Sequence, residues 1–284
     1  MTHSKTKAAL GLALCASFSA GVLADENTVH DADPRNTAFR GGITADDSGE
    51  VRLVTGGGFN NLYGDGEYQT QTIVIAEYFT QSENIRLRLA NFDERFGGVY
   101  TDLYFTDYMN MYTGGYMLPL TATNNKTLLF PSVNYSYIDF DTKEMTKDCG
   151  VNLECAIPPS PSSNAISSMG YSTGSLSGED LYKHLLGGDD DAHMFSVNLY
   201  GLQPWNDTFY TVFQAFSGST YGGVEMEMVD IVLLQGTRTK VGEGVFNIYV
   251  EGKYTNIKLD ELNTSKGYFR GEDAKVSIGF DWRF

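Results

Sequence analysis

Apolar and polar residues alternate strictly along several parts of this chain, most clearly in the final segment 274–284. There every second residue is apolar, and the residues between are small or polar. A period of two residues places successive side chains on opposite faces of a β-strand. The segment is therefore expected to be a strand with one apolar and one polar face. Its apolar residues are Val276, Ile278, Phe280, Trp282 and Phe284.

The same alternation, with varying regularity, predicts ten strands. It is clean in "VFNIYVEGKYT", where Phe246, Ile248 and Val250 oppose Asn247 and Tyr249. The sequence leaves a count of twelve open, if 99–121 holds two strands or 37–44 forms another. The ten predicted strands span 51–62, 69–80, 84–95, 99–121, 127–140, 192–203, 207–217, 225–238, 244–257 and 274–284.

The connections between these strands alternate in length. Links 141–191 and 258–273 are long, whereas 122–126, 203–207 and 239–243 are short. Short turns at one end and long loops at the other are typical of transmembrane β-barrels, whose apolar face meets lipid and whose polar face lines the lumen. A soluble sandwich has no reason to place its long links at one end. The fold class predicted is an all-β, antiparallel transmembrane barrel occupying residues 51–284.

The first residues have the features of a targeting segment. Two lysines precede an apolar and small-residue run that ends in Val22-Leu23-Ala24, a pattern typical of a cleaved secretory signal peptide. Residues 1–24 are read as that peptide. Residues 25–50 are polar and acidic, and we expect a disordered tail there, with a small plug as the alternative.

Composition agrees with one large all-β domain. The chain has 284 residues, of which 42% are hydrophobic and 20% charged, with 18 Tyr and 17 Phe. No run of about 18 apolar residues follows the signal peptide, so no ordinary transmembrane helix is expected. A formal net charge of −16 argues against nucleic acid as a partner, because phosphate binding needs clustered Lys and Arg.

Together these features resemble bacterial outer-membrane β-barrel proteins of the porin-like kind. In that class the barrel-assembly machinery reads a terminal aromatic on an alternating last strand, so the resemblance implies that Phe280, Trp282 and Phe284 form an assembly signal. It also implies a Gram-negative outer-membrane location after signal-peptide cleavage. The partners it implies are outer-membrane lipid, lipopolysaccharide and the assembly machinery.

Charged residues fall on the polar, inward face of several predicted strands. One interpretation is a selectivity field across a water-filled pore that chooses the ion or solute. The other is a closed network of ion pairs that fills a narrow barrel. The candidate lumen residues are Arg86, Arg88, Glu251, Lys253 and Asp281.

The long link 141–191 is the most informative loop. Cys149 and Cys155 are expected to form a disulfide, since an exported chain meets an oxidising compartment. The loop either constricts the barrel mouth or is a mobile surface loop. The run Asp189, Asp190 and Asp191 is the candidate constriction. Divalent-cation binding and a catalytic group at the rim are alternatives to a solvated acidic turn, and the metal remains unknown.

The sequence therefore predicts a narrow passive channel for small solutes or ions, with no cofactor and no enzymatic activity. The alternative is a closed barrel with a structural or surface-binding role through its extracellular loops. A third possibility is a rim-located hydrolase, disfavoured because the histidines after residue 24 lie outside the well-patterned strands.

Overall fold

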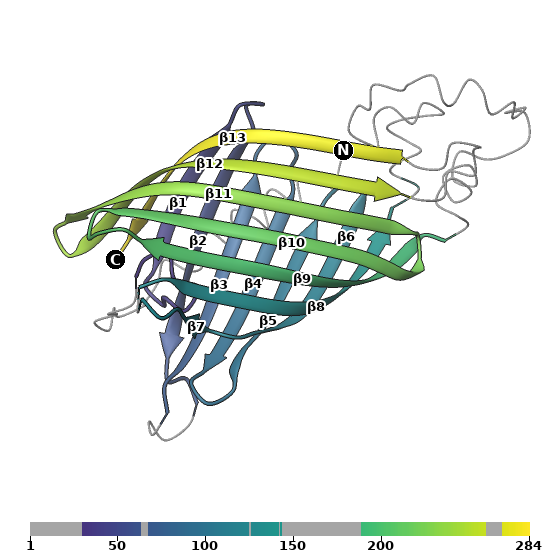
Figure 1. Ribbon diagram of the computed structural model, residues 1–284. Coiled ribbons are helices and arrows are strands. Elements are labelled where there is room, and N and C mark those ends of the chain that lie inside the picture. Colours follow the sequence, from purple (N-terminus) through teal and green to yellow (C-terminus); the bar gives the residue numbers. More distant parts are fainter. Residues whose placement is uncertain (1–29, 64–67, 125, 142, 144–188, 260–268) are drawn as a thin grey trace, which may run out of the picture.

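The computed structural model describes residues 30–63, 68–124, 126–141, 143, 189–259 and 269–284, and its regular elements are β-strands (Figure 1). Twelve of these strands form a barrel wall, and β7 (Leu120–Thr121) is a two-residue strand in a connection. The wall strands are β1 (Arg40–Asp46), β2 (Val51–Asn60), β3 (Thr70–Phe79), β4 (Ile85–Asp93), β5 (Gly97–Phe105), β6 (Met109–Met117), β8 (Leu128–Phe140), β9 (Asp191–Pro204), β10 (Phe209–Gly223), β11 (Met226–Val241), β12 (Gly244–Leu259) and β13 (Phe269–Arg283).

The sheet closes on itself through antiparallel pairs. β1 pairs with β13, with Arg40 opposite Arg283, and β6 pairs with β8, with Met109 opposite Phe140. Closure leaves the described wall without an exposed sheet edge. Because the strand count is even, β1 starts and β13 finishes at the same end, which we call the N/C end. The opposite end, where β8 finishes and β9 starts, is the loop end.

Twelve strands are confirmed, and the favoured count of ten is wrong. A tight turn at Thr106 divides the predicted strand 99–121, because the Thr106 hydroxyl accepts the Met109 N–H and donates to the Met109 carbonyl, both at 2.9 Å. The additional first strand, β1, starts three residues later than the 37–44 considered. Its outward positions include the small residues Gly41 and Ala45, so its alternation gives a weak signal.

The two faces of the wall differ as a membrane barrel requires. Val276 on β13 is 56% exposed, whereas the next residue, Ser277, is 8% exposed. On β9, Phe195 is 63% exposed and Ser196 is 5% exposed. Apolar side chains therefore point outward and polar ones inward, the reverse of a soluble β-sandwich core.

Four inward aromatic rings each lie over a glycine directly opposite on the neighbouring strand. A Cβ built on Gly279 would lie 2.3 Å from Cζ of Tyr249, and one on Gly236 would lie 2.2 Å from Cζ of Tyr210. Aromatic cover of strand glycines is a recognised device of β-sheets. Each ring is thus held close to the backbone of the neighbouring strand. The four pairs are Phe92–Gly98, Tyr100–Gly115, Tyr210–Gly236 and Tyr249–Gly279.

The two halves of the wall differ in height. Strands β1 to β6 have 7 to 10 residues each, whereas β8 to β13 have 13 to 16. The longer strands cross the shorter ones at a steep angle in the ribbon (Figure 1). The interior described below lies between these two halves.

Candidate channel lumen

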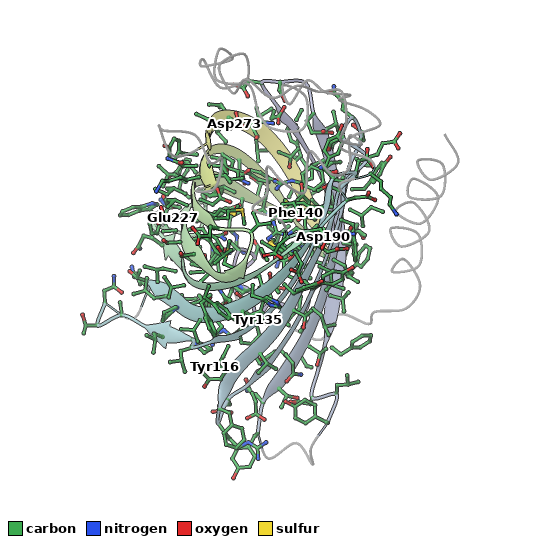
Figure 2. The ribbon with its side chains drawn as sticks, turned by 90° about the vertical axis from the view of Figure 1, so that its right-hand side faces the viewer. Tyr116, Tyr135, Phe140, Asp190, Glu227 and Asp273 are labelled. Carbon is green, nitrogen blue, oxygen red and sulfur yellow. The ribbon has the colours of Figure 1, made fainter. Side chains whose placement is uncertain are left out.

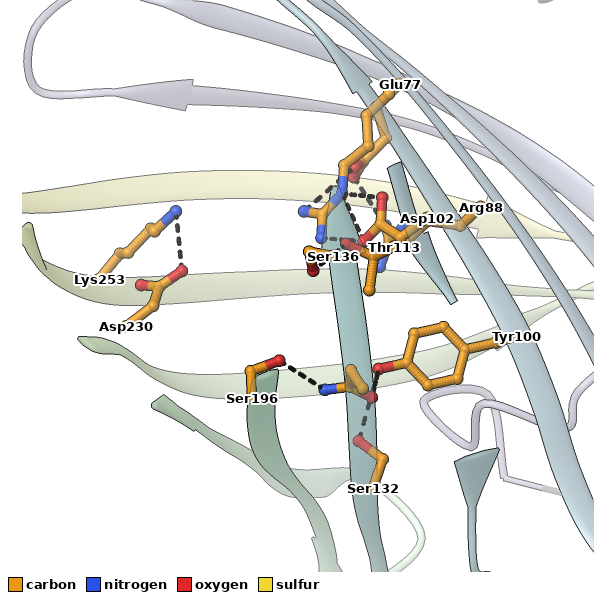
Figure 3. Close-up of polar contacts among 12 residues, drawn as sticks. Glu77, Arg88, Tyr100, Asp102, Thr113, Ser132, Ser136, Ser196, Asp230 and Lys253 are labelled. Atoms are coloured by element: carbon orange, nitrogen blue, oxygen red, sulfur yellow. Dashed lines mark hydrogen bonds and ion pairs between the residues drawn. The ribbon is translucent and has the colours of Figure 1, made fainter. Parts of the chain in front are cut away.

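Glu77 on β3 is the centre of a charged cluster inside the barrel. Its carboxylate lies 2.9 Å from Arg88, 3.8 Å from Arg52 and 3.9 Å from Arg86, and its side chain is only 3% exposed. Arg86 also donates from Nε to both carboxylate oxygens of Asp102, at 2.9 and 3.1 Å. Neighbouring strands β2 to β5 thus join one ion-pair network, part of which Figure 3 shows.

The network continues beyond neighbouring strands. Arg52 lies 3.6 Å from Glu251 on β12, although β1 and β13 separate these two strands in the wall. Farther along β12, Lys253 lies 3.2 Å from Asp230 (Figure 3). Asp230 also accepts a hydrogen bond from Thr255. Charge pairs therefore extend around much of the inner surface.

All five candidate lumen residues point inward, as the alternation predicted. Asp281 accepts a 2.6 Å hydrogen bond from the Asn247 amide and lies 3.7 Å from Arg283. Sequence reasoning named Arg86 and Arg88, but their partner Asp102 was missed. The signal for Asp102 was available in "VYTDLYF", where it shares the inward face with Tyr100 and Tyr104.

The N-terminal segment 30–39 lies inside the barrel near the N/C end, so the expected tail is wrong for these residues. Asp31 lies 3.1 Å from Arg238, and the Tyr200 hydroxyl donates to the Ala32 carbonyl oxygen at 2.5 Å. Asp33 is 3% exposed. Contacts with inward residues of β9 and β11 therefore place this segment in the interior, in the manner of a small plug.

The same segment has its own hydrogen-bonded structure. The Asp33 and Asn36 amides donate to the carbonyls of His30 and Asp33, and Asp33 also accepts from the Arg35 guanidinium. Gly58 of β2 donates to the Thr37 carbonyl at 2.8 Å. Asp and Asn side chains that bond to nearby backbone favour such turns, a signal already present in "HDADPRN".

His30 lies edge-on to the ring of Tyr210, with centroids 5.1 Å apart. Burial, together with the nearby guanidiniums of Arg238 and Arg283, lowers the pKa of His30 to about 4, against the opposing charge of Asp33. His30 is therefore neutral near pH 7 while the segment is docked. Its protonation opposes docking.

Apolar side chains also occur on the inward face, which the sequence did not predict. Near the loop end, residues of β8 and β9 pack with Val224 and Met226. Near the N/C end, Phe130 is fully buried between Phe92 and Tyr200, with ring centroids 6.4 and 5.9 Å away. The inner surface thus combines charged pairs with two apolar clusters, one near each end.

Most of the loop 141–191 lies outside the described residues, as do Cys149, Cys155 and the predicted signal peptide 1–24. Asp189 is exposed, and the Asp190 carbonyl oxygen accepts the Phe140 N–H. Asp191 starts β9 on its outward face, where it lies 4.0 Å from His193. The predicted constriction role therefore does not fit the placement of Asp191, which points away from the lumen.

The candidate assembly residues lie along the outer face near the N/C end. Phe280 and Trp282 both pack against Phe246, with ring centroids 6.2 and 5.7 Å away. Phe284 follows, with its ring 5.8 Å from Trp282 and 6.0 Å from Phe39. The three residues form one continuous aromatic stripe.

Two further observations concern metal sites and helices in the described part of the chain. No group of three or more His, Cys, Asp or Glu side chains there is placed to hold a metal ion. No helix among the described residues is long and apolar enough to cross a membrane.

A closed, antiparallel wall of twelve strands with an apolar outside and a charged inside defines an outer-membrane-type transmembrane β-barrel. No family model matches the sequence, and no curated protein matches it. The solved structures that resemble the chain include the NanC porin, at 12% identity and a TM-score of 0.47, covering 87% of this chain and 99% of that one.

Two further solved structures are similar over the same share of this chain. The KdgM porin is 7% identical with a TM-score of 0.36, and 99% of it is covered. The β domain of the Bordetella autotransporter BrkA is 9% identical with a TM-score of 0.30, and 96% of it is covered. The class assignment rests on this chain's own strands, closure and faces.

Proposed function

We propose that this protein is a narrow, passive channel for small solutes or ions in the outer membrane of a Gram-negative cell. The observation that carries the proposal is the set of inward aromatic rings that lie flat on glycines. Tyr210 over Gly236 and Tyr249 over Gly279 keep two large side chains along the wall. A barrel whose interior served only as a packed core would gain more contact from rings directed across it.

The charges of the inner surface support a selectivity role. Arg86, Arg88 and Lys253 share the inward face with Glu77, Glu251 and Asp281, so a passing ion would meet both signs of charge. Rings and ladders of charge choose between ions in other channels. We propose that these residues set the preference of the channel.

The N-terminal segment 30–39 restricts the channel in this proposal. It occupies the N/C end, which is periplasmic if the barrel follows the usual arrangement of outer-membrane proteins. This role replaces the constriction first assigned to the loop acids, of which only Asp189 and Asp190 remain candidates. The proposed cellular partners remain outer-membrane lipid, lipopolysaccharide and the barrel-assembly machinery.

A second candidate is a closed barrel with a structural or surface-binding role. The ion pair between Arg52 and Glu251 favours it, because it links strands that are not neighbours. Docking of segment 30–39 favours it as well. The two candidates differ in one property, which is whether ions pass through the folded protein.

The test is electrical. The mature chain is refolded, its folding is checked by heat-modifiable gel mobility, and it is added to a planar bilayer in a KCl gradient. Steady single-channel current with a non-zero reversal potential is expected. A folded barrel that shows no current at any voltage tolerated by the bilayer would refute the channel and favour the closed barrel.

A further inference from the structure

Two inward arginines lie directly opposite each other where the barrel closes. Arg40 starts β1, Arg283 ends β13, and the two are partners in the register of that strand pair. Arg40 shares the inward face of β1 with Thr44, and Arg283 is only 5% exposed. Like charges placed directly opposite on paired strands destabilise a sheet. The pair therefore needs negative charge close by.

Arg40 has no such partner in the described part of the chain. No carboxylate there lies within 4.0 Å of its guanidinium, and no side-chain hydrogen bond reaches it. The Nε of Arg283 donates to no described acceptor either, and the carboxylate of Asp281 lies 3.7 Å from it. That carboxylate already accepts a hydrogen bond from Asn247. One positive charge of the arginine pair is thus uncompensated.

Arg40 differs in this respect from the other inward arginines of the described strands. Each of those has a carboxylate within 4.0 Å of its guanidinium. An enclosed charge without a partner destabilises a fold, so the lack of one at Arg40 calls for a reason outside folding. The matched pairs are Arg52–Glu77, Arg86–Asp102, Arg88–Glu77, Arg238–Asp31 and Arg283–Asp281.

The unpaired charge lies in the restricted part of the lumen. Arg40 directly follows the docked segment 30–39 and is partly exposed. Its guanidinium, like those of Arg88 and Arg283, lies within electrostatic range of the Tyr200 hydroxyl. Tyr200 is on β9, across the closed wall from β1. A solute that passes the N/C end therefore comes close to Arg40.

Carboxylates of the loop end are too far away to offset this charge. Figure 2 labels three of them, Asp190, Glu227 and Asp273. They lie just before or near the loop-end starts of β9, β11 and β13, whereas Arg40 lies at the N/C end of β1. The 7 residues of β1 span about 20 Å, well beyond the screening length of about 8 Å at physiological salt. The formal net charge of −16 thus does not determine the potential beside Arg40.

We propose that Arg40 and Arg283 bind one carboxylate group of a small anionic solute in the lumen. Guanidiniums make paired, planar hydrogen bonds to carboxylates, and the single uncompensated charge of the pair matches one singly charged group. The site gives the channel a preference for anions over cations. This role rests on the proposed channel, but binding itself can be measured without current.

Saturation-transfer NMR with acetate as the probe tests the binding, using the chain without residues 1–24 refolded in detergent. Transfer to the acetate methyl protons is expected. Arg40→Gln should weaken acetate binding at least about tenfold, because it removes the unpaired guanidinium. Lys126→Gln is the matched control, since it removes one positive charge from an exposed connection at the N/C end and should leave the transfer unchanged.

Urea unfolding separates binding from folding. Arg40→Gln should unfold at a urea concentration no lower than the unchanged chain, because the lost charge has no carboxylate partner in the described residues. A clear fall in that midpoint would show that Arg40 has a structural partner and would overturn the proposal. Two other results would also overturn it. One is equal acetate transfer in Arg40→Gln and the unchanged chain, both shown folded by heat-modifiable mobility. The other is displacement of acetate by inorganic phosphate at one tenth of its concentration, which would assign the site to a doubly charged group.

The reversal potential in a KCl gradient distinguishes failure of the site from failure of the channel. Chloride preference is expected in the unchanged chain, with a shift toward potassium in Arg40→Gln and no shift in Lys126→Gln. Acetate binding without any current would refute the channel alone. Current whose reversal potential is the same in Arg40→Gln and the unchanged chain would refute the selectivity assigned to Arg40 and leave the channel standing.

Discussion

The hydroxyl of Tyr200 donates a 2.5 Å hydrogen bond to the carbonyl oxygen of Ala32, 168 residues earlier in the chain. Tyr200 is on the inward face of β9, and Ala32 belongs to the segment that precedes the first strand. With the ion pair between Asp31 and Arg238, this contact fixes the segment inside the barrel. The proposed channel is therefore restricted by a piece of its own chain that can be altered without changing the wall.

Gly279→Ala should narrow the lumen. The new methyl group would clash with the Tyr249 ring, which must then turn inward and lose the 2.7 Å hydrogen bond between its hydroxyl and Thr44. We expect lower single-channel conductance and a loss of about 1–3 kcal/mol in unfolding free energy. Gly252→Ala is the control, since its Cβ would meet only a backbone oxygen at 3.9 Å. Unchanged conductance in a folded Gly279→Ala barrel would contradict the claim that the Tyr249 ring keeps the lumen open by lying on Gly279.

Glu77→Gln should strongly destabilise the barrel. The substitution leaves the guanidiniums of Arg52 and Arg88 beside an uncharged group in a buried position, and breaking a buried charge pair costs about 3–5 kcal/mol. Urea unfolding of the refolded protein in lipid vesicles measures the loss. Glu227→Gln is the matched control, because its pair with Lys258 is exposed and should contribute about 0–1 kcal/mol. Similar losses in both variants would contradict the central role of Glu77.

Acidification should loosen the N-terminal segment through His30. Its pKa is about 4 when docked and about 6.5 when free, so the docked state binds fewer protons between these values. The contribution of His30 to docking is complete above about pH 6.5 and is lost progressively as the pH falls toward 4. Hydrogen–deuterium exchange of residues 30–39, corrected for intrinsic rates, should increase relative to the strands between pH 7 and pH 5.

The variant His30→Gln isolates this effect. Asp31 is the neighbouring group to consider, because burial raises its pKa and its protonation favours docking, in the opposite sense. Subtracting the pH dependence of hydrogen–deuterium exchange in His30→Gln from that of the unchanged chain removes the contribution of Asp31. An acid-dependent loosening that persists unchanged in His30→Gln would show that another group is responsible.

Phe284→Ala should impair assembly in cells more than stability in vitro. The side chain is 57% exposed and its ring contacts are with Trp282 and Phe39, so the folded barrel should lose no more than about 1 kcal/mol. The amount of folded, heat-modifiable protein in isolated outer membranes should decrease. The yield of refolding into lipid vesicles should stay the same. Ile278→Ala, on the same face but away from the chain end, is the control. Normal membrane levels of Phe284→Ala would contradict the assembly-signal prediction.

Strand alternation was sufficient to predict the class of fold and the inward direction of Arg86, Arg88, Glu251, Lys253 and Asp281. Periodicity reports which face a side chain occupies, and a barrel wall repeats that rule along every strand. It failed where the outward residues are small, as in β1, and where a turn is made by a single threonine hydroxyl, as at Thr106. Neither feature interrupts the apolar pattern strongly.

The interior partners could not be predicted in the same way. The contacts of Glu77 with Arg52 and of Tyr200 with Ala32 depend on barrel closure, which brings distant strands and the N-terminal segment together. Alternation places Met194 and Phe130 on the inward face with Ser196 and Ser132, but it gave no reason to expect apolar side chains and their contacts there. Register and closure, and not local pattern, determine these contacts.

The most direct test of the central claim is the single-channel conductance of the chain without its predicted signal peptide 1–24, compared with a variant that also lacks residues 25–38. The deletion removes the segment that occupies the N/C end and leaves β1 intact from Arg40. The account predicts a small, steady conductance in the full chain and a larger one in the deletion variant, with both barrels folded. Equal conductance in the two would contradict restriction by the segment, and the absence of current in both would contradict the channel itself.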